Sequence, residues 1–276
     1  MSTRIGVIIV FDKNTDILAK FKEIKELGLQ TCQVNIGEDM SLYTDENAEA
    51  MINASKETGV EISTFWAGWR GPRSWNFYEG QYDLGLVPDE YRADRLEDLM
   101  KAADFVKKLG VKNLATHVGF LSENPADERY LKTVYALRRL CRKLESYGIR
   151  FLFETGQETP VVLMRVMEDI GTSNLGINLD TGNLILYGKA NPIDALDMIG
   201  TKVYDVHLKD GFYPTDGKHL GKEVRFGDGK VNFKEFLPKL KALGYEGSLT
   251  IEREITGEKQ IADIIYARDL IKEYWK

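Results

Sequence analysis

The sequence predicts an α/β fold, a single (β/α)₈ barrel that covers residues 1–276. Eight short runs of apolar and β-branched residues alternate with longer amphipathic stretches from one end of the chain to the other. Several of these stretches are followed by glycine, where a helix is expected to stop. Repeated strand and helix pairs build parallel βαβ units, and eight units in roughly 250 residues favour a closed barrel over an open, doubly wound sheet.

The eight predicted strands are runs of six or seven residues, a length typical of strands. In chain order they are RIGVIIV (4–10), QTCQVNI (30–36), VEISTFW (60–66), VKNLATH (111–117), GIRFLFE (148–154), NLGINLD (174–180), KVYDVHL (202–208) and GSLTIE (247–252). Helices are predicted between them, because four stretches place apolar residues at i, i+3, i+4 and i+7: 16–28, 94–110, 128–148 and 233–244. The expected helix stops are Gly28, Gly59, Gly110, Gly148 and Gly244.

Two connections are longer than a plain barrel needs. They cover residues 67–88, after the third predicted strand, and residues 209–231, after the seventh. Both follow a strand and precede a helix, which is the side on which barrel enzymes build their active sites. Long loops in compact domains are more often functional than accidental, so both are expected to border a site.

The composition excludes several classes of protein. A net charge of −6 disfavours nucleic-acid binding, which usually needs a basic face. Two cysteines, Cys32 and Cys141, cannot build a disulfide framework or a CxxC metal site. No apolar run reaches the roughly 18 residues of a membrane span, and the first residues do not resemble a signal peptide. A cytoplasmic protein is therefore expected, without a nucleic-acid or membrane partner.

Four consecutive predicted strands end in, or close to, a residue that can bind a metal: Glu154, Asp180, His207 and Glu252. A single strand-end carboxylate often only caps the next helix, but four neighbouring strands place these residues around one barrel mouth. Such carboxylates would repel one another without a cation. Three oxygen ligands and one imidazole suit one divalent ion, with Mn²⁺ preferred and Mg²⁺, Co²⁺ and Zn²⁺ as alternatives.

At these residues the chain resembles the xylose-isomerase-like barrel superfamily of sugar isomerases and epimerases, over essentially its whole length. The resemblance is carried by FLFETGQE, NLDTGN, DVHLKDG, GDGKVNF and SLTIERE. It implies that the four strand-end residues bind the metal, and that Glu154 and Glu252 also act as acid and base on the sugar. The metal would stabilise an enediolate, so that a proton next to the carbonyl becomes removable.

Two differences from relatives in this superfamily narrow the functions that the resemblance implies. The chain has three histidines, His117, His207 and His219, too few for the three-zinc site of the related DNA-repair endonucleases. Asn183 stands where those endonucleases and the ketose 3-epimerases carry a histidine. The leading hypothesis is therefore a divalent-metal-dependent isomerase or epimerase of a sugar or sugar phosphate. Alternatives are a lyase or dehydratase with the same centre, acting on a keto-sugar or inosose, and a non-catalytic sugar-binding subunit.

Candidate substrate contacts surround the metal ligands, and each has a plainer alternative. His117 closes the fourth strand and is expected to contact a substrate hydroxyl, or to be an ordinary strand-end histidine. Glu158 either binds a hydroxyl or is a charge in the first helical turn. Asn183 is expected beside the sugar in place of the missing histidine.

The two long loops supply the remaining candidates. Trp66 begins an aromatic segment that would form a wall of the sugar site or an interface in a homo-oligomer. Arg225 lies among loop cations that would receive a phosphate or carboxylate, or would be a solvated charge run. Gly227 and Gly229 fit a tight turn better than a phosphate loop.

Overall fold

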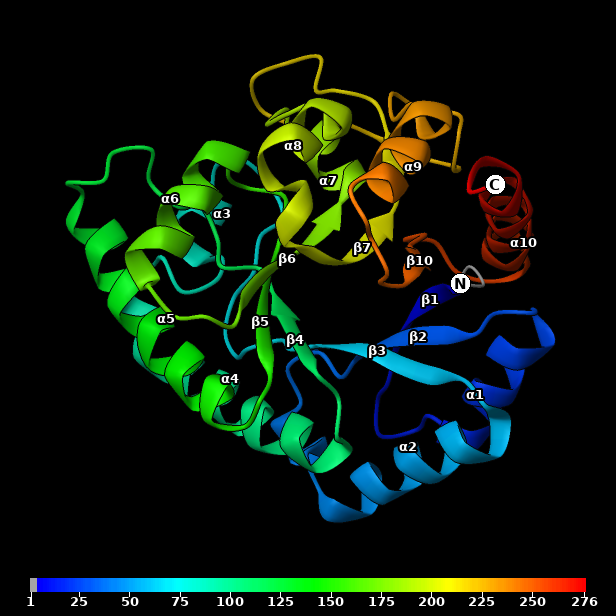
Figure 1. The fold of residues 1–276 in the computed structure, drawn as a ribbon. Helices are drawn as coiled ribbons and strands as arrows, with labels where there is room; N and C mark the ends of the chain where they lie inside the picture. The colour runs from blue at the N-terminus through cyan, green and yellow to red at the C-terminus, as the bar shows by residue number, and fades with distance from the viewer. Residues whose placement is uncertain (1–3) are drawn as a thin grey trace.

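Eight parallel strands close into a barrel in the computed structural model of the protein, which describes residues 4–276 (Figure 1). The order around the barrel is β1-β10-β7-β6-β5-β4-β3-β2, so each strand lies beside its neighbours in the chain. All eight predicted strands are confirmed: β1 (Ile5–Val10), β2 (Thr31–Asn35), β3 (Glu61–Trp66), β4 (Asn113–Thr116), β5 (Arg150–Glu154), β6 (Leu175–Asp180), β7 (Val203–Leu208) and β10 (Leu249–Ile251). The sequence prediction of a (β/α)₈ barrel is therefore correct.

Helices surround the barrel on the outside (Figure 1). They are α1 (Ile17–Glu26), α2 (Asp45–Thr58), α4 (Asp89–Leu109), α5 (Glu128–Ser146), α6 (Pro160–Ile170), α8 (Pro192–Ile199), α9 (Phe233–Ala242) and α10 (Glu258–Tyr274), with short helical segments η1 (Met40–Leu42), α3 (Gly80–Asp83), α7 (Thr181–Leu186) and η2 (Gly200–Lys202). The expected stops are confirmed at α2 and α4, where Gly59 and Gly110 cap the helix with positive φ angles of 76° and 73°. Only glycine adopts this conformation without strain.

Part of the barrel interior is polar, at the level of Asp205 in β7. Asp205 of β7 is fully buried, and its carboxylate accepts hydrogen bonds from the hydroxyls of Ser63 (2.7 Å), Thr64 (2.7 Å) and Thr250 (3.1 Å). Burial raises the pKa of Asp205, although these hydroxyls oppose the shift. Because side chains alternate along a strand, His207 points into the same interior two residues nearer the carboxyl end. The strand pattern thus carries His207 to the mouth of the barrel.

The loop of residues 67–88 is held by one fully buried arginine. The guanidinium of Arg95 in α4 donates to the backbone carbonyls of Arg70 (3.0 Å), Pro72 (2.6 Å), Asp83 (2.6 Å) and Gly85 (2.8 Å). A buried cation with this many acceptors fixes the backbone around it. The loop is therefore a rigid part of the barrel mouth and contains α3.

The loop of residues 209–231 folds around a buried carboxylate. Asp210 accepts backbone N–H bonds from Gly211 (2.8 Å), Gly227 (2.9 Å), Gly229 (2.9 Å) and Val231 (3.0 Å). The two short strands β8 (Asp210–Gly211) and β9 (Glu223–Val224) pair antiparallel within it. The glycines therefore form a tight turn around Asp210, which leaves the turn amides no free capacity for a phosphate.

Both cysteines, Cys32 and Cys141, are buried and free, so they form no disulfide. Within residues 4–276, no helix is both long and apolar enough to cross a membrane.

Candidate metal centre and substrate cavity

The carboxyl ends of four adjacent strands bring Glu154, Asp180, His207 and Glu252 together. Each residue offers one ligand atom, and these four atoms all lie within 4.8 Å of one another. Glu154 ends β5, Asp180 ends β6 and pairs in register with His207 of β7, and Glu252 directly follows β10. Parallel strands in one register place their last side chains around a single opening, which is why a cluster forms from distant parts of the chain.

The cluster has the properties of a cation site. The Nδ1 atom of His207 lies 3.0 Å from Glu154 Oε1 and 3.1 Å from Glu252 Oε2, and Glu154, Asp180 and His207 are almost completely buried. Across the described residues, neither this Nδ1 nor Asp180 Oδ2 has a hydrogen-bond partner of acceptable geometry. Buried polar atoms without partners that converge on one point suit a shared metal ion. The donor set, three carboxylates and one imidazole, fits a divalent cation.

The charges of the cluster demand a cation. Burial lowers the pKa of His207, but Glu154 and Glu252 outweigh burial and hold that pKa well above its usual range. Burial raises the pKa of Glu154, yet the nearby His207 and His117 hold it well below the ordinary value. The Glu154 carboxylate thus stays ionised and attracts positive charge into the centre, whereas burial raises the pKa of Asp180 to about 6.

Two amides inside the barrel orient the imidazole of His207, Asn178 from the adjacent strand β6 and Gln33 from β2, which does not adjoin β7. His207 Nε2 lies 2.8 Å from Gln33 Oε1, and the Gln33 amide donates to Asn178 Oδ1 at 3.1 Å. Gln33 and Asn178 are fully buried inside the barrel. The Asn178 amide nitrogen also lies 3.1 Å from Nε2, but the Gln33 carbonyl oxygen is nearer. An acceptor at Nε2 favours the tautomer that carries its proton there, which leaves the Nδ1 lone pair directed at the cluster.

The ammonium group of Lys209 adds a positive charge to the same cluster. Its Nζ lies 3.2 Å from Asp180 Oδ2, 3.2 Å from Glu252 Oε2 and 3.0 Å from Glu254 Oε1, and its side chain is only 2% exposed. Burial opposes the charge of the ammonium, but the three carboxylates hold its pKa well above the usual value. Lys209 begins the long loop of residues 209–231, whose cations the sequence predicts either to receive a phosphate or carboxylate or to be solvated. Its spacing of two residues from His207 was the signal that it points to the same side.

His117 and Trp66 both contact the Glu154 carboxylate. His117 Nε2 lies 3.4 Å from Glu154 Oε1, and the indole N–H of Trp66 donates to Glu154 Oε2. The rings of Trp66 and Trp75 meet the His117 ring edge-on, with centroids 5.9 and 5.0 Å away. His117 is therefore no isolated strand-end histidine: it lies between the metal cluster and an aromatic wall.

A cavity of about 270 Å³ opens above the cluster. Glu154, Glu252 and His117 form its polar base, and Trp66 belongs to its wall. The other lining residues are Ile8, Asn35, Trp75, Asn183, Leu186, Tyr187, Leu220 and Glu254. Both long loops contribute, Trp75 from the first and Leu220 from the second, as the sequence suggested. Such a cavity, mostly apolar with a few convergent polar groups, is typical of a small-molecule site.

Glu158, in the loop after β5, does not line this cavity. It is 3% exposed, and burial raises its pKa to about 8, against the opposing charges of His117 and Lys189. Its Oε2 and both amide atoms of Gln157 have no hydrogen-bond partner anywhere in the described chain. These unpaired polar atoms have capacity for ligand hydroxyls.

Of the remaining two predicted substrate contacts, Asn183 lies at the cavity and Arg225 lies outside it. Asn183 lines the cavity, and its backbone N–H caps α7 by donating to Asp180 Oδ1 at 2.8 Å. Arg225 does not line the cavity: its guanidinium pairs with Asp228 at 3.0 Å and lies 4.0 Å from the ring centroid of Tyr266 in α10. The loop turns this arginine outward against the last helix, so we do not retain it as a substrate contact.

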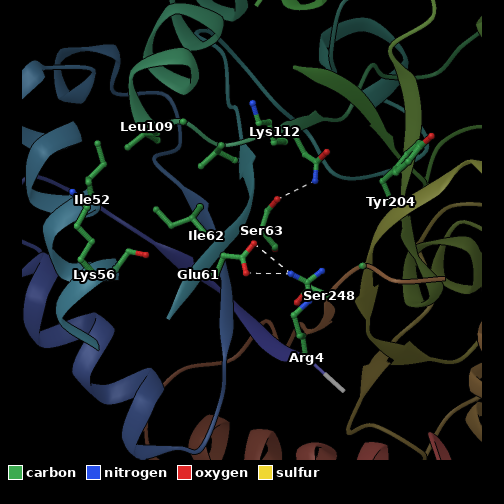
Figure 2. A pocket seen from close by; sticks show the side chains of 15 residues that line it. Arg4, Ile52, Lys56, Glu61, Ile62, Ser63, Leu109, Lys112, Tyr204 and Ser248 are labelled. Carbon is green, nitrogen blue, oxygen red and sulfur yellow. Dashed lines mark hydrogen bonds and ion pairs between the residues drawn. The ribbon is translucent and has the colours of Figure 1, made fainter. Parts of the chain in front are cut away.

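A second cavity, of about 320 Å³, lies at the opposite end of the barrel (Figure 2). It is lined by residues at the amino ends of strands, including Glu61, Ser63 and Tyr204, and an ion pair between Arg4 and Glu61 lies within it. Although it is larger, it is remote from the metal cluster. Barrel enzymes place their chemistry at the carboxyl ends of the strands, so the smaller cavity is the candidate active site.

The fold and the cluster together define a (β/α)₈ barrel with one carboxylate–histidine centre at its mouth. The chain belongs to the xylose isomerase-like TIM barrel family, whose model matches residues 21–274. This confirms the family resemblance that we found in the strand-end motifs.

Individual relatives agree with this assignment. The crystal structure of a xylose isomerase domain protein from Planctomyces limnophilus superposes with a TM-score of 0.91 and 31% identity, over 99% of this chain and 97% of that one. The uncharacterized protein MJ1311 of Methanocaldococcus jannaschii is 30% identical over 65% of this chain, and the chain spans only 61% of that protein. The L-ribulose-5-phosphate 3-epimerase UlaE of Shigella sonnei is 26% identical, over 92% of this chain and 88% of the epimerase.

Proposed function

We propose that this protein is a divalent-metal-dependent isomerase or epimerase of a carbohydrate, acting by proton transfer next to a carbonyl group. The observation that carries the proposal is the set of four convergent ligand atoms beneath a sugar-sized cavity. The sugar 3-epimerase among the relatives supports the same class of reaction. Mn²⁺ is the first ion to test, with Mg²⁺, Co²⁺ and Zn²⁺ as alternatives.

A divalent ion held by Glu154, Asp180, His207 and Glu252 would polarise the substrate carbonyl and stabilise the enediolate that forms when the neighbouring proton leaves. Glu154 and Glu252 would exchange that proton, one as base and the other as acid. Their carboxylates approach His207 Nδ1 from different strands, β5 and the end of β10, and both residues line the cavity. Trp66 and His117 would keep Glu154 oriented.

Isotope exchange tests this proposal directly. The metal-loaded protein is incubated in D₂O with a panel of ketoses, ketose phosphates and 3-keto-sugars, and NMR follows deuterium at the carbons next to the carbonyl. Exchange is expected with at least one member and should stop when a chelator is added. Exchange that persists after complete metal removal would exclude the metal-dependent mechanism.

Variants test the metal ligands and the acid–base residues. Asp180→Asn should lose the ion, which metal analysis detects at about one per chain in the wild type. Glu154→Gln and Glu252→Gln should each abolish exchange. Arg225→Ala is the matched control, because this residue lies outside the cavity. Full exchange by either glutamine variant would show that the acid–base assignment is wrong, and no exchange with any sugar would favour a binding protein.

A further inference from the structure

The charged residues that line the metal-side cavity are almost all acidic. Glu154, Glu252 and Glu254 are lining residues, and among residues 4–276 no lysine or arginine lines this cavity. Glu254 lies nearest to solvent, with a side chain that is 58% exposed. Because Glu154 and Glu252 would hold the proposed ion, the negative charge that an entering ligand meets at the rim is that of Glu254.

The cations near the mouth are already engaged or face elsewhere. Lys209 contacts three carboxylates and is buried, and Arg225 pairs with Asp228. Lys218 and Lys222 flank Leu220 in the sequence, but both are exposed and neither lines the cavity. A phosphate group needs charge-assisted donors such as these, and the cavity offers it none.

The uncharged part of the lining suits a neutral sugar. Trp66, Trp75, Leu186 and Leu220 present apolar surface. Opposite them lie polar atoms without a partner in the described part of the chain, at His117 Nδ1 and Tyr187 Oη. Tryptophan faces pack on sugar C–H groups, while unpaired buried polar atoms accept and donate to hydroxyls.

We infer that the substrate is an uncharged, polyhydroxylated carbohydrate without a phosphate group, a conclusion that rests on the proposed function. The lining offers a phosphate ester no cation as a partner and places Glu254 at its rim, whereas the apolar wall with its polar groups suits hydroxylated rings or chains. This substrate differs from that named for the Shigella relative, a sugar phosphate.

Paired ligands test the inference. D-Fructose and D-fructose 6-phosphate, and L-ribulose and L-ribulose 5-phosphate, are titrated into the full chain with and without Mn²⁺. Calorimetry and the fluorescence of the cavity tryptophans report binding. The unphosphorylated member of at least one pair should bind at least about tenfold more tightly, since one unfavourable charge contact is worth roughly that factor. Tighter binding of the phosphate ester, or no binding of any uncharged sugar, would overturn the inference.

A charge variant sharpens the comparison. Leu220→Lys adds a cation to the lining and should shift the preference toward the phosphate ester by about tenfold, whereas Leu220→Gln, similar in size but neutral, should not. The D₂O exchange assay separates the two proposals. Binding of neutral sugars without exchange would refute only the proposed reaction, and exchange confined to phosphorylated sugars would refute only the substrate class.

Discussion

Gln33 provides a sharp prediction, because it touches the metal centre only through His207. Its Oε1 accepts from His207 Nε2 at 2.8 Å, and its amide donates to Asn178. Nδ1 of His207 lies between Glu154 and Glu252, which attract a proton to that atom. The Gln33 carbonyl favours a neutral imidazole whose proton is on Nε2. In that form Nδ1 carries no proton and its lone pair can bind a metal.

Gln33→Leu removes the acceptor with little change in volume. The Nε2–H group of a ligated His207 would then be buried without a partner, at a cost of about 1–3 kcal/mol. Loss of a partner that orients a metal-binding histidine typically weakens metal affinity by about 10- to 100-fold, which is the same size of effect. We therefore expect the Mn²⁺ dissociation constant of this variant to rise within that range.

Competition with a fluorescent chelator measures this constant without requiring turnover. Gln33→Glu keeps an acceptor at the same place and should recover much of the lost affinity. Thr133→Val is the matched control: it removes a buried hydroxyl that donates to Arg129 O at 2.7 Å in α5, outside the barrel, and should leave metal affinity unchanged. Wild-type affinity in Gln33→Leu would refute the role of Gln33 in orienting His207.

Three further predictions follow from the buried charges. Lys209→Met should destabilise the metal-free protein by about 3–5 kcal/mol in urea unfolding, because its carboxylate partners lose their counter-ion. Mn²⁺ should stabilise this variant more than it stabilises the wild type. Equal stability of variant and wild type without metal would contradict the prediction. Glu158 has a folded-state pKa of about 8, so its contribution to stability is present at low pH and is lost as pH rises toward 8. Glu158→Gln should flatten that decline between pH 5 and 9, and an unchanged pH profile would count against the raised pKa. Arg225→Ala should change stability by no more than about 0.5 kcal/mol and leave sugar affinity intact, whereas a large rise in the sugar dissociation constant would restore this residue to the site.

The barrel could be predicted from the sequence because its strands and helix stops are set locally. Strands of a parallel barrel are covered on both faces, so they appear as nearly continuous apolar runs. β6 is an example, since all six of its residues are buried. The position of glycine after a helix is also predictable from local sequence, because the left-handed conformation depends only on the backbone. The internal structure of the long loops depends instead on Arg95 and Asp210, which bind backbone atoms up to 25 residues away.

The metal ligands could be predicted because each ends a strand, and parallel strands end at the same mouth. Gln33 and Lys209 escaped notice for a different reason. Gln33 reaches Asn178 across 145 residues of sequence, and an amide inside a barrel gives no pattern of its own. Lys209 begins a loop that carries several exposed cations, and sequence alone does not distinguish its burial from their exposure. Arg225 is the reverse case, because the sequence does not show that the loop turns its side chain toward Asp228 and Tyr266 and away from the cavity.

The position of Lys209 also bears on how many ions the centre can hold. A divalent ion among the four ligand atoms would leave one negative charge from the carboxylates of Glu154, Asp180 and Glu252, and the Lys209 ammonium balances it. Lys209 reaches Asp180 and Glu252 at 3.2 Å each, so a second ion bridging those two carboxylates would have to displace a buried, paired lysine. Such a displacement would leave a charged side chain buried without partners, which is strongly unfavourable. The Lys209 ammonium and the small number of histidines therefore both favour a single metal ion. The cluster has neither further ligands nor further negative charge for a second ion.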